Sequence, residues 1–500
     1  MPGRPAASVR DVTAAGRATE PVIVGTCCLS MFMIAIDTTV VNLALPLIGR
    51  GLHAPVAGLQ WTIAAYSVTT ASLMLTSGAI GDRFGRRRVL QAGLAVFTLA
   101  SAGCSIAPNV GWLIAFRALQ GAGGSALTPM SMGIITATFT DPAARTRAIG
   151  LWSGTFGAGM VAGPAAGGVL AAAWGWRSLF WITTLPGVIA MVMAGLVIPD
   201  SRAARPGHID APGQGLVIAF LACLVYGIIG GPSTGWRSPP VLAMFGACAA
   251  AVVLLVGWER RCADPLIDLR VFRSIPFSGA LVITVCAFAC LGGFLFLTTL
   301  YLQDVHGLGV RQAGLQLIPL AAATAAAGPL AGRVMGRGGA RGPLTFAGTA
   351  LAASCLMLAQ APSAAPWAFL AATYAAFGAG YGAVNTVISA VAIAGMPRAR
   401  AGVAGGITSA GRQAGQSLGV SVAGAILAGR LHCTIRDGFA GASHPAWLVI
   451  AACGFVVLLL SLVSTWGRRY EPRHARPQAS RGHLPLRPAS HRCGADCADK

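Results

Sequence analysis

Long apolar runs separated by short polar segments are the dominant pattern along this chain. A helix needs about 20 apolar residues to cross the hydrocarbon core of a bilayer. Runs of about that length occur fourteen times, at 22–47, 57–80, 88–107, 111–136, 149–172, 178–198, 213–232, 240–257, 276–301, 312–334, 343–361, 366–393, 401–428 and 445–467. The pattern therefore predicts an all-α integral membrane protein with fourteen transmembrane helices.

The composition supports this interpretation and excludes a soluble protein. Of the 500 residues, 55% are hydrophobic and only 10% are charged, and the mean hydropathy is +0.69. A soluble domain carries roughly 25% charged residues, which it needs to cover its surface. This chain must therefore be surrounded largely by lipid.

The formal net charge of +21 raises the possibility of nucleic-acid binding. The basic residues, however, lie in short clusters between the apolar runs and form no basic face. If the N-terminus lies inside, cytoplasmic segments contain 28 of the 36 Arg and Lys residues and external segments contain six. This asymmetry is typical of plasma-membrane proteins and places both termini in the cytoplasm. We expect no nucleic-acid partner.

An internal repeat divides the chain into two halves. The segment Gly78–Arg86 has a weaker copy at 328–337, and Arg145–Ala148 has one at 398–401, so the two offsets are 250 and 253 residues. Paired halves are a common transporter plan. The predicted domains are a cytoplasmic tail (1–20), a six-helix bundle (21–200), two inserted central helices (201–258), a second six-helix bundle (259–467) and a basic cytoplasmic tail (468–500).

Four stretches resemble the fourteen-span drug:proton antiporters of the major facilitator superfamily. They are Asp37–Pro46, the loop Gly78–Leu90, Leu113–Gly121 with Arg117 and Gln120, and Gly159–Gly168. The resemblance implies a multi-pass transporter that exports a small organic compound, such as an antibiotic or related drug, by alternating access. Its partners would be the small molecule, protons and the lipid bilayer. We expect a monomer without a cofactor, driven by the proton gradient.

Asp37 is the only acidic residue well inside a predicted span. A charge there costs at least about 2.5–3.5 kcal/mol, so an intramembrane acid indicates function. At a rise of 1.5 Å per residue, Asp37 and Arg117 lie about 15 and 9 Å from the outer surface, within reach of an arginine side chain. We predict that Asp37 carries the proton and that Arg117 is its partner. The alternative is a purely structural ion pair.

Three further groups of residues are assigned roles. The loop after the second span is the predicted conformational gate, with Gly78, Asp82, Arg83, Gly85, Arg86 and Arg87. The resemblance implies an antiporter motif in the fifth span at Gly159, Gly163, Pro164, Gly167 and Gly168, where small residues let helix backbones approach closely. Candidate substrate ligands in the thirteenth span are Arg412, Gln413 and Gln416.

Other functions are less well supported by the sequence. An uptake symporter is the first alternative, and the glycine–proline pattern of the fifth span argues against it. A transport-dead membrane sensor is the second. The sequence contains no nucleophile with a neighbouring base and no phosphate-binding loop, so we predict that the protein is not an enzyme. The tail residues His491, Cys493 and Cys497 lack a second ligand pair, and we expect no metal site.

Overall fold

The computed structural model describes residues 9–139, 141–202, 210–262, 266–362, 365–394, 401–431 and 435–463, and this part of the chain contains helices and no strands. The N-terminal helices are α1 (Val9–Leu52), α2 (Val56–Phe84), α3 (Arg86–Ser105), α4 (Val110–Thr138), α5 (Pro142–Trp174), α6 (Ser178–Val197), α7 (Ala211–Thr234) and α8 (Pro239–Glu259). The C-terminal helices are η1 (Leu269–Arg273), α9 (Ile275–Leu300), the π-helix η2 (Tyr301–Val305), α10 (Val310–Gln316), α11 (Ile318–Gly338), α12 (Arg341–Ala359), α13 (Trp367–Ala394), α14 (Ala401–Arg430) and α15 (Ile435–Val463).

Eleven of the described helices are long and apolar enough to cross a membrane, so the chain is a multi-pass membrane protein. The other long helices are α3, α4 and α14, and their sequences include Arg117, Arg412 and many small residues. A helix that packs against other helices on most of its surface does not need a uniformly apolar composition. The predicted run 312–334 is divided between α10 and α11, and Pro319 begins α11 where a proline is tolerated.

Helices α1–α6 and α9–α15 pack in the same order. In the first set α1 packs on α5 and α6, α2 on α4, and α3 on α4 and α6. In the second set α9 packs on α14 and α15, α11 on α13, and α12 on α13 and α15. The two sets meet where α2 contacts α14 and where α5 contacts α10 and α11. The second set therefore repeats the helix pairing of the first.

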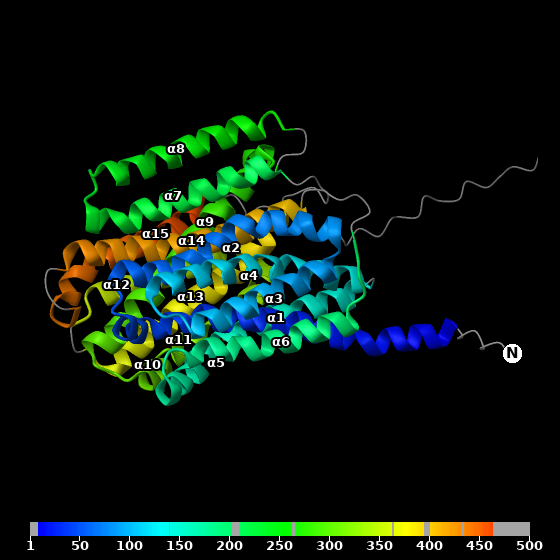
Figure 1. Ribbon diagram of the computed structural model, residues 1–500, viewed down its shortest axis with the longest axis horizontal. Coiled ribbons are helices and arrows are strands. Elements are labelled where there is room, and N and C mark those ends of the chain that lie inside the picture. Colours follow the sequence, from blue (N-terminus) through cyan, green and yellow to red (C-terminus); the bar gives the residue numbers. More distant parts are fainter. Residues whose placement is uncertain are drawn as a thin grey trace, which may run out of the picture.

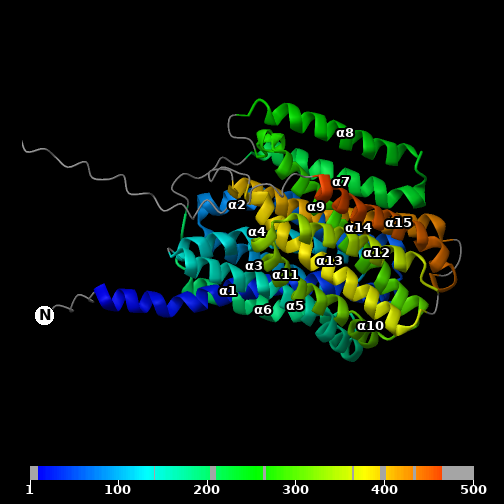
Figure 2. The same ribbon diagram turned by 180° about the vertical axis from the view of Figure 1, so that it is seen from behind.

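The remaining two long helices lie at one side of the bundle. Helix α7 packs on α2 and α14, while α8 packs mainly on α7 and is the outermost helix in both views (Figures 1 and 2). Asp210 begins α7 by accepting a hydrogen bond from the Gly213 N–H at 2.9 Å. Asp141 begins α5 in the same way. These acids satisfy N–H groups that a helix start leaves free.

The two predicted tails of the chain are described only in part. Helix α1 begins at Val9, its first turns project beyond the bundle (Figure 1), and its membrane-spanning part is Glu20–Leu52. The predicted basic tail 468–500, with His491, Cys493 and Cys497, lies outside the described residues. So do Arg398 and Arg400 of the second repeat copy.

Candidate functional site

A buried ion pair joins α1 to α4 at the centre of the first bundle. Asp37 is 1% exposed and Arg117 is 2% exposed. The Arg117 Nη1 donates to both carboxylate oxygens of Asp37 at 2.9 Å. Gln120, one turn further along α4, donates to Asp37 Oδ1 at 3.0 Å and accepts from Arg117 Nη1 at 2.6 Å. The sequence had indicated Asp37 and Arg117 as partners, and the structure brings them together.

Helix α2 completes the surroundings of Arg117. The Thr62 carbonyl oxygen accepts from Arg117 Nε at 3.1 Å, and the guanidinium carbon lies 4.5 Å from the centre of the Tyr66 ring. An aromatic face attracts a cation, most strongly where water is excluded. Arg117 therefore contacts a carboxylate, uncharged oxygen atoms and an aromatic ring. Of these partners, only the Asp37 carboxylate can lose its charge by binding a proton.

The predicted antiporter motif packs α5 on two different helices. A Cβ at Gly159 or Gly167 would come within 2.6 or 2.8 Å of a side chain on α1, and one at Gly163 would overlap Thr39. A Cβ at Gly168 would meet Arg311 Cα of α10 at 3.1 Å, and one at Gly314 of α10 would overlap the Pro164 carbonyl oxygen. The motif thus packs α5 against α1, which carries Asp37, and against α10 of the second half of the chain.

The predicted gate residues hold the end of the first bundle together. Arg86 donates to Asp82 Oδ1 at 2.8 Å and to the Gly133 carbonyl of α4 at 3.0 Å. Arg87 donates to the Ile198 carbonyl at the end of α6 at 3.3 Å. Gly85 has a φ of 109°, which glycine adopts readily, and Asp200 lies against it. Arg83 is exposed, and a Cβ at Gly78 would meet nothing within 4 Å.

These contacts join α2, α3, α4 and α6, which all belong to the first half of the chain. Asp200, which the sequence did not identify, also forms a 3.5 Å ion pair with Arg88. Within the described ranges, the loop therefore links helices of one half and is not seen to bridge the two halves. In the sequence, the only indication of a role for Asp200 was that it is an acid directly after an apolar run.

The candidate substrate ligands lie on α14 in the second half. The Arg412 guanidinium carbon is 5.6 Å from the centre of the Phe288 ring on α9, and Tyr381 of α13 meets the same ring edge-on, with 5.4 Å between ring centres. Arg412 and Gln413 are partly accessible, whereas Gln416 is 6% exposed. The amide oxygen of Gln413 accepts no hydrogen bond from the described residues. The structure therefore adds two aromatic rings to the predicted polar set.

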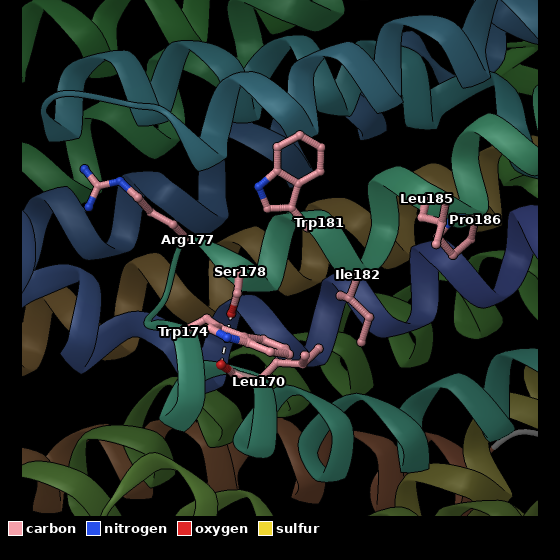
Figure 3. Close-up of a pocket in the computed structure, with 8 residues that line it drawn as sticks. All are labelled: Leu170, Trp174, Arg177, Ser178, Trp181, Ile182, Leu185 and Pro186. Atoms are coloured by element: carbon pink, nitrogen blue, oxygen red, sulfur yellow. Dashed lines mark hydrogen bonds between the residues drawn. The ribbon is translucent and has the colours of Figure 1, made fainter.

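A separate groove of about 690 Å³ lies between α5 and α6 (Figure 3). It is lined by Leu170, Trp174, Arg177, Ser178, Trp181, Ile182, Leu185 and Pro186. Trp174, Trp181 and Leu185 are exposed, and the lining is largely apolar. Since these three side chains are exposed, the groove lies on the outside of the helix bundle, and its lining does not include Asp37.

Two partners of the ion pair, Gln120 and Tyr66, were not predicted as site residues. Gln120 carried a signal, because it lies three residues after Arg117 and so on the same face of α4. Tyr66 carried none, since its place over the guanidinium depends on how α2 packs on α4.

Comparison with known proteins agrees with this arrangement. Residues 27–420 match the family model of the Major Facilitator Superfamily. The chain belongs to this superfamily. It is therefore a membrane transporter and not an enzyme, as the sequence predicted.

Relatives within the superfamily include several resistance proteins. The multidrug resistance protein Stp of Mycobacterium tuberculosis is 35% identical over 82% of this chain and 76% of its own length. The tetracenomycin C resistance and export protein of Streptomyces glaucescens is 35% identical over 83% of this chain and 78% of its own. The methylenomycin A resistance protein of Streptomyces coelicolor is 32% identical over 92% of this chain and 95% of its own.

Solved structures share the fold of the chain. A bacterial homologue of the human lysosomal transporter Spinster, in an inward-facing and unoccupied conformation, matches with a TM-score of 0.60. The match covers 89% of this chain and 97% of the other, with 18% sequence identity. At this identity the likeness extends to the transporter fold alone.

Proposed function

We propose that this transporter exports a small organic compound, such as an antibiotic or related drug, in exchange for protons. The buried Asp37–Arg117 pair carries this proposal. A carboxylate loses its proton readily beside an arginine, and it holds the proton more tightly when the arginine moves away in a dry environment. Asp37 can therefore bind and release a proton as α1 and α4 shift relative to each other.

Alternating access would couple that proton to the substrate. The fourteen predicted spans would form two six-helix bundles, 21–200 and 259–467, which rock against each other, with 201–258 inserted between them. The recurrent order of helix packing supports this plan. Proton and substrate must each favour a different one of the two states, because a ligand shifts an equilibrium only by its differential affinity.

The direction of transport is supported by the relatives and by α5. Three relatives are named for resistance to, or export of, antibiotics or several drugs. Close packing of the glycine motif in α5 on α1 and α10 agrees with the antiporter motif that the sequence resembles.

Expression of the protein in a drug-sensitive bacterium tests this function. We expect resistance to at least one compound of an antibiotic panel, and we expect an uncoupler to abolish the efflux. Everted vesicles should accumulate the compound when a proton gradient, acidic inside, is imposed. Loss of the compound from such vesicles under the same gradient would instead indicate an uptake symporter, and a complete lack of flux would favour a sensor.

A further inference from the structure

Two buried acids lie together where α7 begins and α8 ends. Asp210, which caps α7, and Glu259, the last residue of α8, are each 4% exposed. The residue before Glu259 is Trp258, and its indole Nε1 donates to Asp210 Oδ1 at 2.9 Å. The hydrogen bond ties the end of α8 to the start of α7, and Glu259 lies within electrostatic range of Asp210.

Each carboxyl group has one oxygen with hydrogen-bond donors and one without. Asp210 Oδ1 accepts from Gly213 N and from Trp258, and Glu259 Oε1 accepts from the Ile267 N–H at 3.2 Å. Asp210 Oδ2 and Glu259 Oε2 are buried and have no hydrogen-bond partner among the described residues. Because buried polar atoms are nearly always paired, each of these oxygens indicates a missing donor.

No cation of the described residues supplies that donor. Helix α7 contains no charged residue, and the basic residues that follow Glu259, which are Arg260, Arg261, Arg270 and Arg273, are exposed. The nearest charges on α2 are Asp82 and Arg83, Asp268 caps η1, and α14 contributes Arg412, which lies over Phe288. None of the ion pairs of the described residues includes Asp210 or Glu259. These ranges also contain no group of three metal-ligating side chains here or elsewhere.

We propose that Glu259 binds a proton at a site that is separate from Asp37, beside the carboxylate of Asp210. Two neighbouring carboxylates are costly to bury together in the ionised form. A proton on Glu259 removes one of the two charges and supplies an O–H donor beside a carboxyl oxygen that otherwise lacks one.

This site is linked to the main bundle through Gln214. Gln214 lies one turn after Asp210 in α7, donates to the Ser72 carbonyl of α2 at 2.8 Å and accepts a hydrogen bond from Thr76. The next residues of α2 lead into the Gly78–Arg87 loop. A change of charge at Glu259 would act on the start of α7, and the contacts of Gln214 connect that part of α7 to α2. The inference does not depend on export or on the role of Asp37.

Infrared spectroscopy of the purified protein in lipid nanodiscs tests the site directly. The measurements use an Asp37→Asn background, so that Asp37 contributes no signal and failure of the proposed export has no effect. Near neutral pH we expect a carboxylic acid C=O band, which an ionised carboxylate lacks. Glu259→Gln and Asp210→Asn should each remove most of this band, because each deletes one of the two repelling groups. Trp258→Phe should shift it.

Asp141→Asn is the matched control, since Asp141 also caps a helix but is exposed. It should leave the band unchanged. Asparagine can still cap α7; if Asp210→Asn nevertheless fails to fold, Glu259→Gln decides the result. An identical band in Glu259→Gln and its parent would overturn the proposal. So would loss of the band at constant pH on addition of Mg²⁺, because the site would then bind a metal ion.

Discussion

The two halves of this transporter repeat one order of helix packing but differ in their deep charges. In the first half, Asp37 and Arg117 form an ion pair in which both side chains are almost fully buried. In the second half, α14 carries Arg412 beside Phe288 and Tyr381, and the sequence has no acidic residue from 305 to 436. The same scaffold therefore holds a neutral ion pair on one side and a cation among aromatic rings on the other.

This difference in buried charge indicates that the two halves have different functions. A carboxylate beside an arginine can exchange a proton as the distance between them changes. An arginine beside aromatic rings cannot titrate in the accessible pH range, but it can pair with a carboxylate or a carbonyl group of a ligand. We propose that the first half binds the proton and that the second half recognises the substrate. The following changes would break or sharpen that contrast.

The largest effect is expected from Asp37→Asn. The substitution removes the titratable group of the first half, so proton-coupled export should be lost completely while the protein still inserts into the membrane. Drug susceptibility and pH-gradient dependence measure the effect, and detection of the protein in membrane fractions checks insertion. Asp141→Asn, at the exposed start of α5, should retain resistance. Unchanged resistance and unchanged gradient dependence in Asp37→Asn would refute the role of Asp37.

A double-mutant cycle tests whether the ion pair acts as a unit. Asp37→Asn and Arg117→Gln should each lower the free energy of unfolding by about 3–5 kcal/mol, because each leaves a buried charge without its partner. The double substitution should cost less than the sum of the two. Unfolding of the purified variants in detergent gives the three values. Strict additivity would show that the two side chains are not coupled.

The contact between the halves should be sensitive to a single methyl group. Gly314→Ala places a Cβ against the Pro164 carbonyl oxygen, and we expect a destabilisation of about 1–3 kcal/mol together with slower transport. Gly157→Ala on α5 is the control, because a Cβ there meets nothing within 4 Å. Thermal unfolding and export rates should separate the two variants. Equal behaviour would show that α5 and α10 are not closely packed in the working protein.

The smallest effect is expected from Arg412→Gln. Loss of one charged hydrogen bond to the substrate is worth about 1.5 kcal/mol, which corresponds to a loss of affinity of roughly tenfold. Arg430→Gln, at the exposed end of α14, should have no such effect. Dicationic dyes should be poor substrates, since two deep arginines oppose one carboxylate. Robust export of a dication by both wild type and Arg412→Gln would contradict the assignment of the second half.

The contact that sequence could predict joins two charges that lie in apolar runs. Asp37 and Arg117 could be paired from their depths alone, because two opposite charges in neighbouring spans have few other partners in a membrane. Gln120, Tyr66 and Thr62 could not be assigned in the same way, since uncharged groups occur in many spans without function. Asp210 and Glu259 were also overlooked, because each lies at the end of a helix, where acids are common and usually solvated.

Sequence alone determined the class of this protein. The lengths of its apolar runs, its low charge content and four motifs predicted a helical membrane transporter of the major facilitator superfamily, because the bilayer imposes its thickness on each helix. Tertiary structure decided which polar atoms meet. Gln120 reaches Asp37, Arg412 faces Phe288 and Trp258 contacts Asp210. Each contact requires that two helices pack together at a particular position along their axes. These positions depend on close packing at small residues such as Gly163 and Gly314. Such a fit involves two segments that are distant in the sequence, so no single stretch of sequence encodes it.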